Sequence, residues 1–159
     1  MIEIHKSGTL TTIQDAGRPG YQELGVPESG ALDNFAFRCA NILVGNPENT
    51  AVLEAVLFGP EIKFSEDTFI AITGADLGPS VDGEVVNMWK TLEVSSGSIL
   101  RFSGPTGNGM RTYLSISGGF AGDGTKRVMN SYSTYIPVSY THLRAHETEA
   151  DLVCRLLLE

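Results

Sequence analysis

Five polar side chains with the chemistry to bind a small amide or carboxylate lie close together in one segment. They are Gln14, Asp15, Arg18, Ser29 and Asp33. A side-chain amide or carboxylate can accept a hydrogen bond from a substrate N–H, and an arginine can hold a carboxylate through two parallel hydrogen bonds. Glycines and prolines interrupt the segment, so it predicts a shaped loop whose backbone can approach a ligand closely.

Each of these side chains also has a structural interpretation. Arg18 could fasten the loop through a salt bridge to Asp15 or Asp33. Asp15 could instead close a turn by accepting backbone N–H groups, and Ser29 could act in the same way. For Asp33 the favoured interpretation is the cap of a following helix, because an apolar-periodic run begins directly after it.

Two more turns place glycine and polar groups directly after predicted strands. Thr73, Gly74 and Asp76 form one turn, and Gly118 with Gly119 forms the other. Backbone N–H groups in such turns can stabilise an oxyanion, although a tight turn alone would need the same residues. The candidate catalytic residues are Gln14, Asp15 and Arg18, and the candidate substrate-binding residues are Ser29, Asp33, Thr73, Gly74, Asp76, Gly118 and Gly119.

The elements that must position these residues are mainly β-strands. Short β-branched or aromatic runs, bounded by glycine or acidic turns, predict strands over residues 2–5, 10–13, 51–57, 61–64, 68–73, 98–102 and 111–117. Asp82-Gly83, between two valine-bearing arms, predicts a β-hairpin over residues 79–86. Many short strands at close spacing favour a barrel or a sandwich.

One helix is predicted, from Asp33 to about residue 43 or 44. Asp33 is a good N-cap, and Gly45 stands where the end of a helix favours glycine. The side chains expected on its apolar face are Phe35, Cys39, Ile42 and Leu43. The free N–H groups of its first turn would lie close to the polar loop, where they could bind an anion.

Several longer segments of the sequence resemble those of one known family. These are T-T-I-Q-D-A-G-R-P-G-Y-Q-E-L-G-V-P-E-S-G-A-L-D (11–33), R-C-A-N-I-L-V-G-N-P-E-N-T-A-V-L-E (38–54), F-G-P-E-I-K-F (58–64), A-I-T-G-A-D-L-G (71–78), S-I-S-G-G-F (115–120) and V-M-N-S-Y-S-T-Y (128–135). Together they resemble the N-terminal half of the biotin-dependent carboxyltransferase-like proteins. That family includes the C-type subunit of 5-oxoprolinase, allophanate hydrolase subunit 2, the carboxyltransferase part of urea carboxylase and the Kip-inhibitor antagonist. The resemblance implies a mainly β fold, a cyclophilin-like β-barrel with one helix at about residues 33–44, truncated relative to the family.

The resemblance implies three alternative functions. A relative of the C-type 5-oxoprolinase subunit would help to open the lactam 5-oxoproline to glutamate at the expense of ATP, together with companion 5-oxoprolinase subunits such as a cyclophilin-fold protein of the B type. A relative of urea carboxylase or allophanate hydrolase would use biotin carried on another chain. A relative of the Kip-inhibitor antagonist would be a non-catalytic regulator of a sensor-kinase inhibitor. ATP or carrier-borne biotin is implied for the complex, and we expect this chain alone to bind neither and to be inactive.

The end of the chain, from Val138 to Glu159, has a different character. Codons chosen for residues 138–148 spell a transposase-type sequencing adapter, and codons chosen from Asp151 onward spell the flow-cell end of the same adapter. We therefore expect residues 1–137 to form the N-terminal half of a carboxyltransferase-like domain, and residues 138–159 to be a non-native tail without specific packing against it. His142 and His146 have the spacing of two metal ligands on a helix, but they belong to this tail and predict no metal site.

Composition and charge exclude several classes of protein. The chain has 159 residues, a net charge of −8 and no concentrated basic patch, which argues against nucleic acid or an anionic membrane as a partner. Outside the tail only His5 and Cys39 remain, too few for a metal cluster of histidines and cysteines or for a disulfide. No apolar run could span a bilayer and no leader follows Met1, so we expect a cytoplasmic protein.

Overall fold

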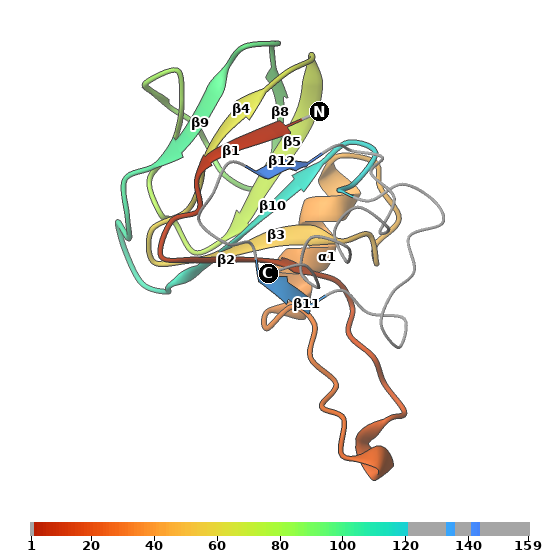
Figure 1. Cartoon of the computed structure of the whole chain (residues 1–159). Coiled ribbons are helices and arrows are strands. Elements are labelled where there is room, and N and C mark those ends of the chain that lie inside the picture. The colour runs from red at the N-terminus through yellow and green to blue at the C-terminus, as the bar shows by residue number, and fades with distance from the viewer. Residues whose placement is uncertain (1, 121–132, 136–140, 144–159) are drawn as a thin grey trace.

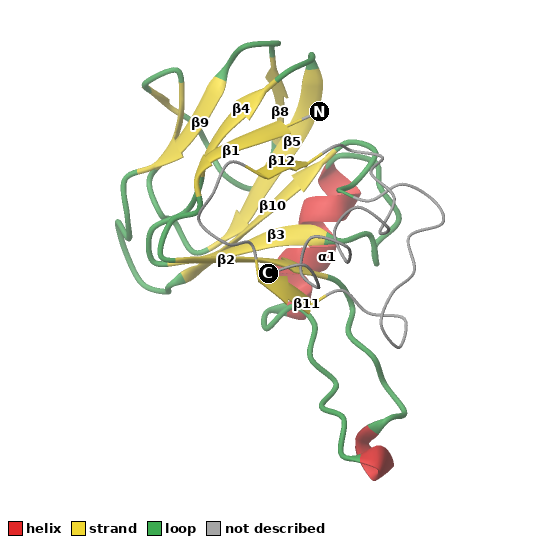
Figure 2. Ribbon diagram, in the orientation of Figure 1, coloured by secondary structure: helices red, strands yellow, loops and turns green. Residues whose placement is uncertain are grey.

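The computed structural model describes residues 2–120, 133–135 and 141–143. They form a mainly β protein with two antiparallel sheets and one α-helix (Figures 1 and 2). The first sheet has the strand order β12-β1-β4-β9-β6-β7, and the second has the order β11-β2-β3-β10-β5-β8. Both the mainly β class and the single α-helix were predicted from the sequence.

The strands have the following bounds. The first sheet contains β1 (Ile2–Lys6), β4 (Glu61–Phe64), β6 (Pro79–Val81), β7 (Glu84–Val85), β9 (Ile99–Phe102) and β12 (Thr141–Leu143). The second contains β2 (Leu10–Gln14), β3 (Val52–Val56), β5 (Thr68–Gly74), β8 (Thr91–Val94), β10 (Arg111–Ile116) and β11 (Ser133–Tyr135). Strand β8 was not predicted, because its sequence, T-L-E-V, is short and half polar.

Buried apolar side chains from both sheets form one core. Ile4 and Ile62 contribute from the first sheet, and Ile13, Leu53 and Leu114 contribute from the second. Side chains alternate along each strand, so Ile62 faces this core while its neighbours on β4 face outward. The described strands therefore stack as two sheets over a shared core, which corrects the expectation of a closed barrel.

Helix α1 (Asn34–Leu43) covers the other face of the second sheet. Its buried side chains are Ala36, Phe37, Ala40 and Asn41, whereas Phe35 is 72% exposed and Ile42 is 55% exposed. The predicted apolar face of the helix was therefore wrong. The small alanines let the helix backbone approach the sheet, and the carbonyl of Ala36 accepts a hydrogen bond from the Thr73 hydroxyl at 2.7 Å.

The predicted ends of α1 are confirmed. The Asp33 Oδ1 accepts a hydrogen bond from the Ala36 N–H at 3.0 Å, as an N-cap does. After the C-cap at Val44, Gly45 has a φ of 75°, a left-handed conformation that glycine adopts without steric cost. Neither helix of the described residues, α1 or the short 3₁₀ helix η1 (Gln22–Leu24), is long and apolar enough to cross a membrane.

The predicted hairpin is also confirmed, because β6 and β7 pair antiparallel around Asp82 and Gly83. Both turn residues have positive φ, of 52° and 90°, as a tight turn between twisted strands needs. In contrast, β12 pairs with β1 at Thr141–Leu143, where we expected no specific contact. Main-chain groups make such pairs whatever side chains they carry. Residues 138–140 and 144–159 lie outside the described residues, and the adapter origin of the tail stays a prediction.

Candidate functional site

The loop between β2 and α1 leaves the body of the protein as a long arm, residues 16–30 (Figure 1). Its base closes at Asp15, whose carbonyl accepts a hydrogen bond from the Ala31 N–H at 2.9 Å. The Asp15 side chain is buried, and its Oδ1 accepts from the Gly17 N–H at 2.8 Å. A Cβ on Gly30 would lie 2.7 Å from the Gly17 nitrogen, so the two sides of the arm touch through glycine backbone. Asp15 thus closes the turn at the base of the arm.

Arg18 fastens the two sides of the arm to each other. Its Nε donates to the Pro27 carbonyl at 3.0 Å, and its Nη2 donates to the Ser29 hydroxyl at 2.9 Å. Its backbone N–H donates to the Glu28 carbonyl at 2.8 Å. Both Arg18 and Ser29 therefore have a structural role in the arm, and their roles toward a ligand stay predictions.

Where the arm returns to the body, the two residues before α1 bind a buried carboxylate and a buried tyrosine. The Leu32 N–H donates to Glu54 Oε2 at 3.0 Å, and the Asp33 N–H donates to the Tyr113 hydroxyl at 2.9 Å. Glu54 lies on β3 directly opposite Tyr113 on β10, so both side chains point to the face that carries the helix. The start of α1 is thus fixed to two strands of the second sheet.

Arg111, at the start of β10, completes this arrangement. Its Nη1 donates to Glu54 Oε1 at 2.6 Å, and the two side chains are 36% and 6% exposed. Glu54 therefore accepts hydrogen bonds from a guanidinium and from a backbone N–H, and such partners are what a buried carboxylate needs. No hydrogen bond within the described residues uses Nε or Nη2 of Arg111. We call Leu32, Asp33, Glu54, Arg111 and Tyr113 the Glu54 cluster.

The electrostatics of the Glu54 cluster keep the Tyr113 hydroxyl protonated. Burial raises the pKa of Tyr113 far above its usual value. The Asp33 N–H works in the opposite direction, and the negative charge and hydrogen bond of Glu54 raise the pKa further. The Tyr113 hydroxyl therefore remains a donor toward Glu54 while it accepts the Asp33 N–H.

Gln14 lies at the end of β2, on the face that carries the helix. Its side chain is 9% exposed, and its Nε2 donates to the Thr12 hydroxyl at 3.0 Å. Its Oε1 is buried without a hydrogen-bond partner, the one such side-chain atom found in the described part of the chain. Thr12 lies directly opposite Glu54, but Gln14 lies opposite Val52, two residues further along β3. Gln14 is therefore beside the Glu54 cluster rather than within it.

The second predicted group, Thr73, Gly74 and Asp76, divides between two roles. Thr73 is buried and its hydroxyl donates to the Ala36 carbonyl of the helix, and its role toward a substrate stays a prediction. Gly74 has a φ of 86°, and a Cβ there would lie 2.6 Å from the Arg111 carbonyl, so glycine allows the close approach beside the cluster. Asp76 closes an exposed turn by accepting the Gly78 N–H at 2.8 Å.

Gly118 and Gly119 lie at the end of the second sheet opposite to Arg111. They follow the end of β10, whereas Arg111 begins it. The Gly118 N–H donates to Asn46 Oδ1 at 2.9 Å, next to the C-terminal end of α1. The structure therefore separates this glycine pair from Arg111 and Gly74 by the length of β10, whereas Gln14 lies toward the same end of the sheet as the pair.

Sequence reasoning missed Glu54, Arg111 and Tyr113, which tie the predicted Asp33 to the sheet. One signal could have revealed the first of them. The segment V-L-E-A-V of β3 places a glutamate inside an apolar strand, where a charge needs a partner. The partner itself, Arg111, lies 57 residues away in the sequence, and no local pattern indicates it.

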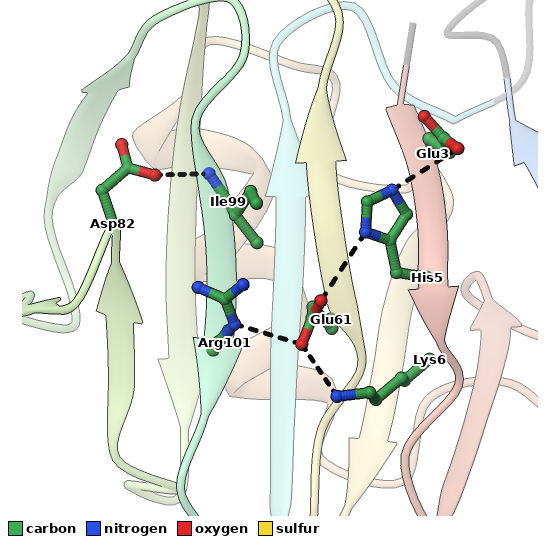
Figure 3. A network of polar contacts seen from close by, with 7 residues as sticks. All are labelled: Glu3, His5, Lys6, Glu61, Asp82, Ile99 and Arg101. Atoms are coloured by element: carbon green, nitrogen blue, oxygen red, sulfur yellow. Dashed lines mark hydrogen bonds and ion pairs between the residues drawn. The ribbon is translucent and has the colours of Figure 1, made fainter.

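A second polar network lies on the outer face of the first sheet (Figure 3). Glu61 accepts hydrogen bonds from Lys6 Nζ at 3.2 Å and from Arg101 Nε at 3.1 Å. His5 Nδ1 lies 3.6 Å from Glu61, and its Nε2 lies 3.4 Å from Glu3. Lys6 is 75% exposed and Arg101 is 46% exposed, so water screens this network. The described residues contain no cluster of three or more side chains that could hold a metal ion.

Comparison with known proteins assigns the chain to a family. The family model described as carboxyltransferase domain, subdomain A and B, matches residues 24–151. The chain belongs to this carboxyltransferase domain family. The resemblance inferred from the sequence is thereby confirmed.

Relatives of this carboxyltransferase domain include proteins of two kinds. Urea amidolyase of Saccharomyces cerevisiae is 43% identical over 135 residues, which is 84% of this chain and 7% of that protein. The C-type 5-oxoprolinase subunit of Escherichia coli is 38% identical over 138 residues, which is 87% of this chain and 43% of that protein. The solved structure of K. lactis urea amidolyase matches with a TM-score of 0.77 at 36% identity, over 84% of this chain and 8% of that chain. The chain thus spans less than half the length of each relative.

Proposed function

We propose that this chain is the substrate-binding part of a protein like the C-type 5-oxoprolinase subunit, which takes part in the ATP-dependent opening of the lactam 5-oxoproline to glutamate. One observation carries the choice of substrate. Arg111 is held by Glu54 at the base of the arm and keeps two guanidinium nitrogens without a described partner. A guanidinium suits a carboxylate, which 5-oxoproline has and urea lacks.

In this proposal Arg111 binds the substrate, and the residues around it position its guanidinium. Arg111 binds the substrate carboxylate through Nε and Nη2, and Glu54 positions the guanidinium by holding Nη1 at 2.6 Å. Tyr113 and the Leu32 N–H keep Glu54 in place, so the arginine is pre-oriented before the substrate binds. Gly74 has no side chain, so the backbone of β5 can lie close to the Arg111 carbonyl.

We also propose that the described residues bind neither ATP nor biotin. A triphosphate needs several uncommitted cations around a phosphate-binding backbone, and the sequence has no G-x-x-x-x-G-K-[ST] motif. Arg18 is fastened into the arm, Arg38 pairs with Glu48, and Lys6 and Arg101 share Glu61. Of the described lysines that remain, Lys63 is on β4 of the first sheet and Lys90 directly precedes β8 of the second. We therefore assign ATP, or carrier-borne biotin in the alternative below, to another part of the assembly.

A carboxyl transfer to urea is the second candidate, because the identity to the yeast urea amidolyase, 43%, exceeds that to the C-type 5-oxoprolinase subunit of E. coli, 38%. A chimera separates the two functions. Residues 1–120 of this chain replace the matching part of that E. coli protein, and the chimera is co-expressed with the other subunits of the enzyme. We expect ATP hydrolysis that depends on 5-oxoproline and not on urea.

The control for this experiment is the same chimera with Arg38→Gln, which changes an exposed arginine of α1 away from the cluster. It should keep the activity of the chimera. A folded chimera that copurifies with the other subunits but hydrolyses no ATP with 5-oxoproline would contradict the proposed function.

A further inference from the structure

The arm is longer than its connection requires. The Asp15 carbonyl and the Ala31 N–H are hydrogen-bonded at 2.9 Å, so the chain leaves and re-enters the body at one point. A turn of a few residues would join β2 to α1 there. Instead residues 16–30 extend away from both sheets (Figure 1), and of these fifteen residues only Gly17 is buried.

The arm is nevertheless held in one shape. Arg18 joins its two sides through the Pro27 carbonyl and the Ser29 hydroxyl. The far end is closed by hydrogen bonds from the Gly25 N–H to the Gln22 carbonyl at 2.9 Å and from the Val26 N–H to the Tyr21 carbonyl at 3.3 Å. Fixing an exposed segment costs conformational entropy, and burial within this chain offsets little of it. A binding element that is already ordered loses less entropy when it binds, so the rigid shape favours a role in recognition.

The tip of the arm has a defined chemistry. It is a short 3₁₀ turn, η1 (Gln22–Leu24), from which Leu24 projects with 74% of its surface exposed. Glu23 and Glu28 are exposed nearby, and no lysine or arginine occurs between Arg18 and Arg38. The surface that complements this tip is an apolar pocket with a basic rim.

We infer that the arm docks this chain to a companion protein of the same assembly, with Leu24 inserted into an apolar pocket whose rim carries lysine or arginine. The identity of the companion rests on the proposed function, since relatives named as one subunit of 5-oxoprolinase are, by that name, parts of an assembly. A second copy of this chain is disfavoured as the partner, because each copy has a net charge of −8 and an acidic arm tip. Like charges placed together at an interface suppress association.

The test measures binding of the full chain to the other subunits of the E. coli 5-oxoprolinase by isothermal titration calorimetry. Leu24→Asp should weaken binding by at least about tenfold, as expected when a central apolar anchor is lost. The matched control is Val85→Asp, since Val85 is 86% exposed and lies on β7 of the first sheet, outside the arm. This control should bind as tightly as the unaltered chain, and melting curves should show both variants folded.

Each other outcome overturns the inference. These outcomes are no binding by the unaltered chain, equal binding by Leu24→Asp, or a dimer of this chain that Leu24→Asp disrupts. The proposed function can fail on its own. A complex that forms through Leu24 but hydrolyses no ATP with 5-oxoproline would contradict the proposed function and leave the docking role intact. Conversely, full activity with Leu24→Asp would remove the docking role and leave the proposed function standing.

Discussion

Two networks, each centred on a glutamate, lie in different surroundings on this molecule. Glu54 lies beneath the start of α1, where Arg111 and the Leu32 N–H bind it. Glu61 lies on the outer face of the first sheet, where Lys6 and Arg101 bind it from neighbouring strands (Figure 3). The two carboxylates have similar kinds of partner, but only the first network joins separate elements in a place that water does not reach freely.

This difference in burial leads us to expect different contributions of the two ion pairs to stability and to ligand binding. Removing one member of a buried network leaves the other members desolvated and unpaired, whereas water replaces a missing member of an exposed one. A network that holds Arg111 in one orientation can also prepare it for a ligand. We therefore expect the Glu54 cluster to respond strongly to substitution and the Glu61 network to respond weakly.

The largest effect should come from Glu54→Gln. This change leaves Arg111 without its carboxylate and places an amide N–H group against other donors. We expect the free energy of unfolding to fall by about 2 to 4 kcal/mol, less than for a fully buried pair because water reaches part of Arg111. Urea denaturation measures the loss. A value like that of Glu61→Gln would show that burial does not distinguish the two networks.

Tyr113→Phe should have the next largest effect. It removes the acceptor of the Asp33 N–H and a donor to Glu54, at a cost of about 1 to 3 kcal/mol. The pKa of Tyr113 is raised in the folded protein, so the unfolded chain loses this proton first as the pH rises above about 10. The unaltered chain should then lose stability with a slope of up to about 1.4 kcal/mol per pH unit from this group, and the variant should lack that slope.

Asp33→Ala tests the cap alone, because the Asp33 backbone N–H to Tyr113 remains. Loss of the hydrogen bond to the Ala36 N–H should cost about 1 kcal/mol. Thermal unfolding followed by circular dichroism measures the change. Asp33→Asn, which keeps a capping oxygen, is the matched control and should lose only a few tenths of that amount.

The smallest effect should come from Glu61→Gln. Partial burial acts to raise the pKa of Glu61, but the hydrogen bonds and charges of Arg101 and Lys6 outweigh it, so the pKa lies below its usual value. The ionised Glu61 thus contributes stability above the unfolded pKa, and this contribution is lost as the pH falls through the folded pKa. Because its partners are exposed, we expect less than about 1 kcal/mol at pH 7, and no difference between variant and unaltered chain in strong acid. A larger loss at neutral pH would mean that the exposed network is structurally important.

Local features of the fold could be predicted from the sequence because their causes are local. Asp33 and Gly45 mark the ends of α1 through their own backbone and side-chain preferences. Asp82 and Gly83 mark a hairpin in the same way. The buried face of α1 could not be predicted from large apolar residues, because close packing on the sheet selected Ala36 and Ala40 instead.

The candidate site was only partly predictable for a different reason. Asp15 and Asp33 are recognisable because they bind backbone groups two or three residues away. The Glu54–Arg111 pair joins two strands far apart in the sequence, so it depends on the register between β3 and β10. Arg18 was recognisable as a loop residue. Its hydrogen bonds to Pro27 and Ser29 could not be predicted, because they depend on how the arm folds back on itself.

The most direct test of the account is the binding of 5-oxoproline to the full chain, compared with 2-pyrrolidinone, the same lactam without a carboxylate. Calorimetry on the unaltered chain and on Arg111→Lys measures both ligands, with Arg101→Lys as the matched control. We predict that 5-oxoproline binds at least about tenfold more tightly than 2-pyrrolidinone, and that Arg111→Lys alone reduces this preference, because lysine cannot form the two parallel hydrogen bonds. Equal binding of the two lactams, or an unchanged preference in Arg111→Lys, would contradict the account.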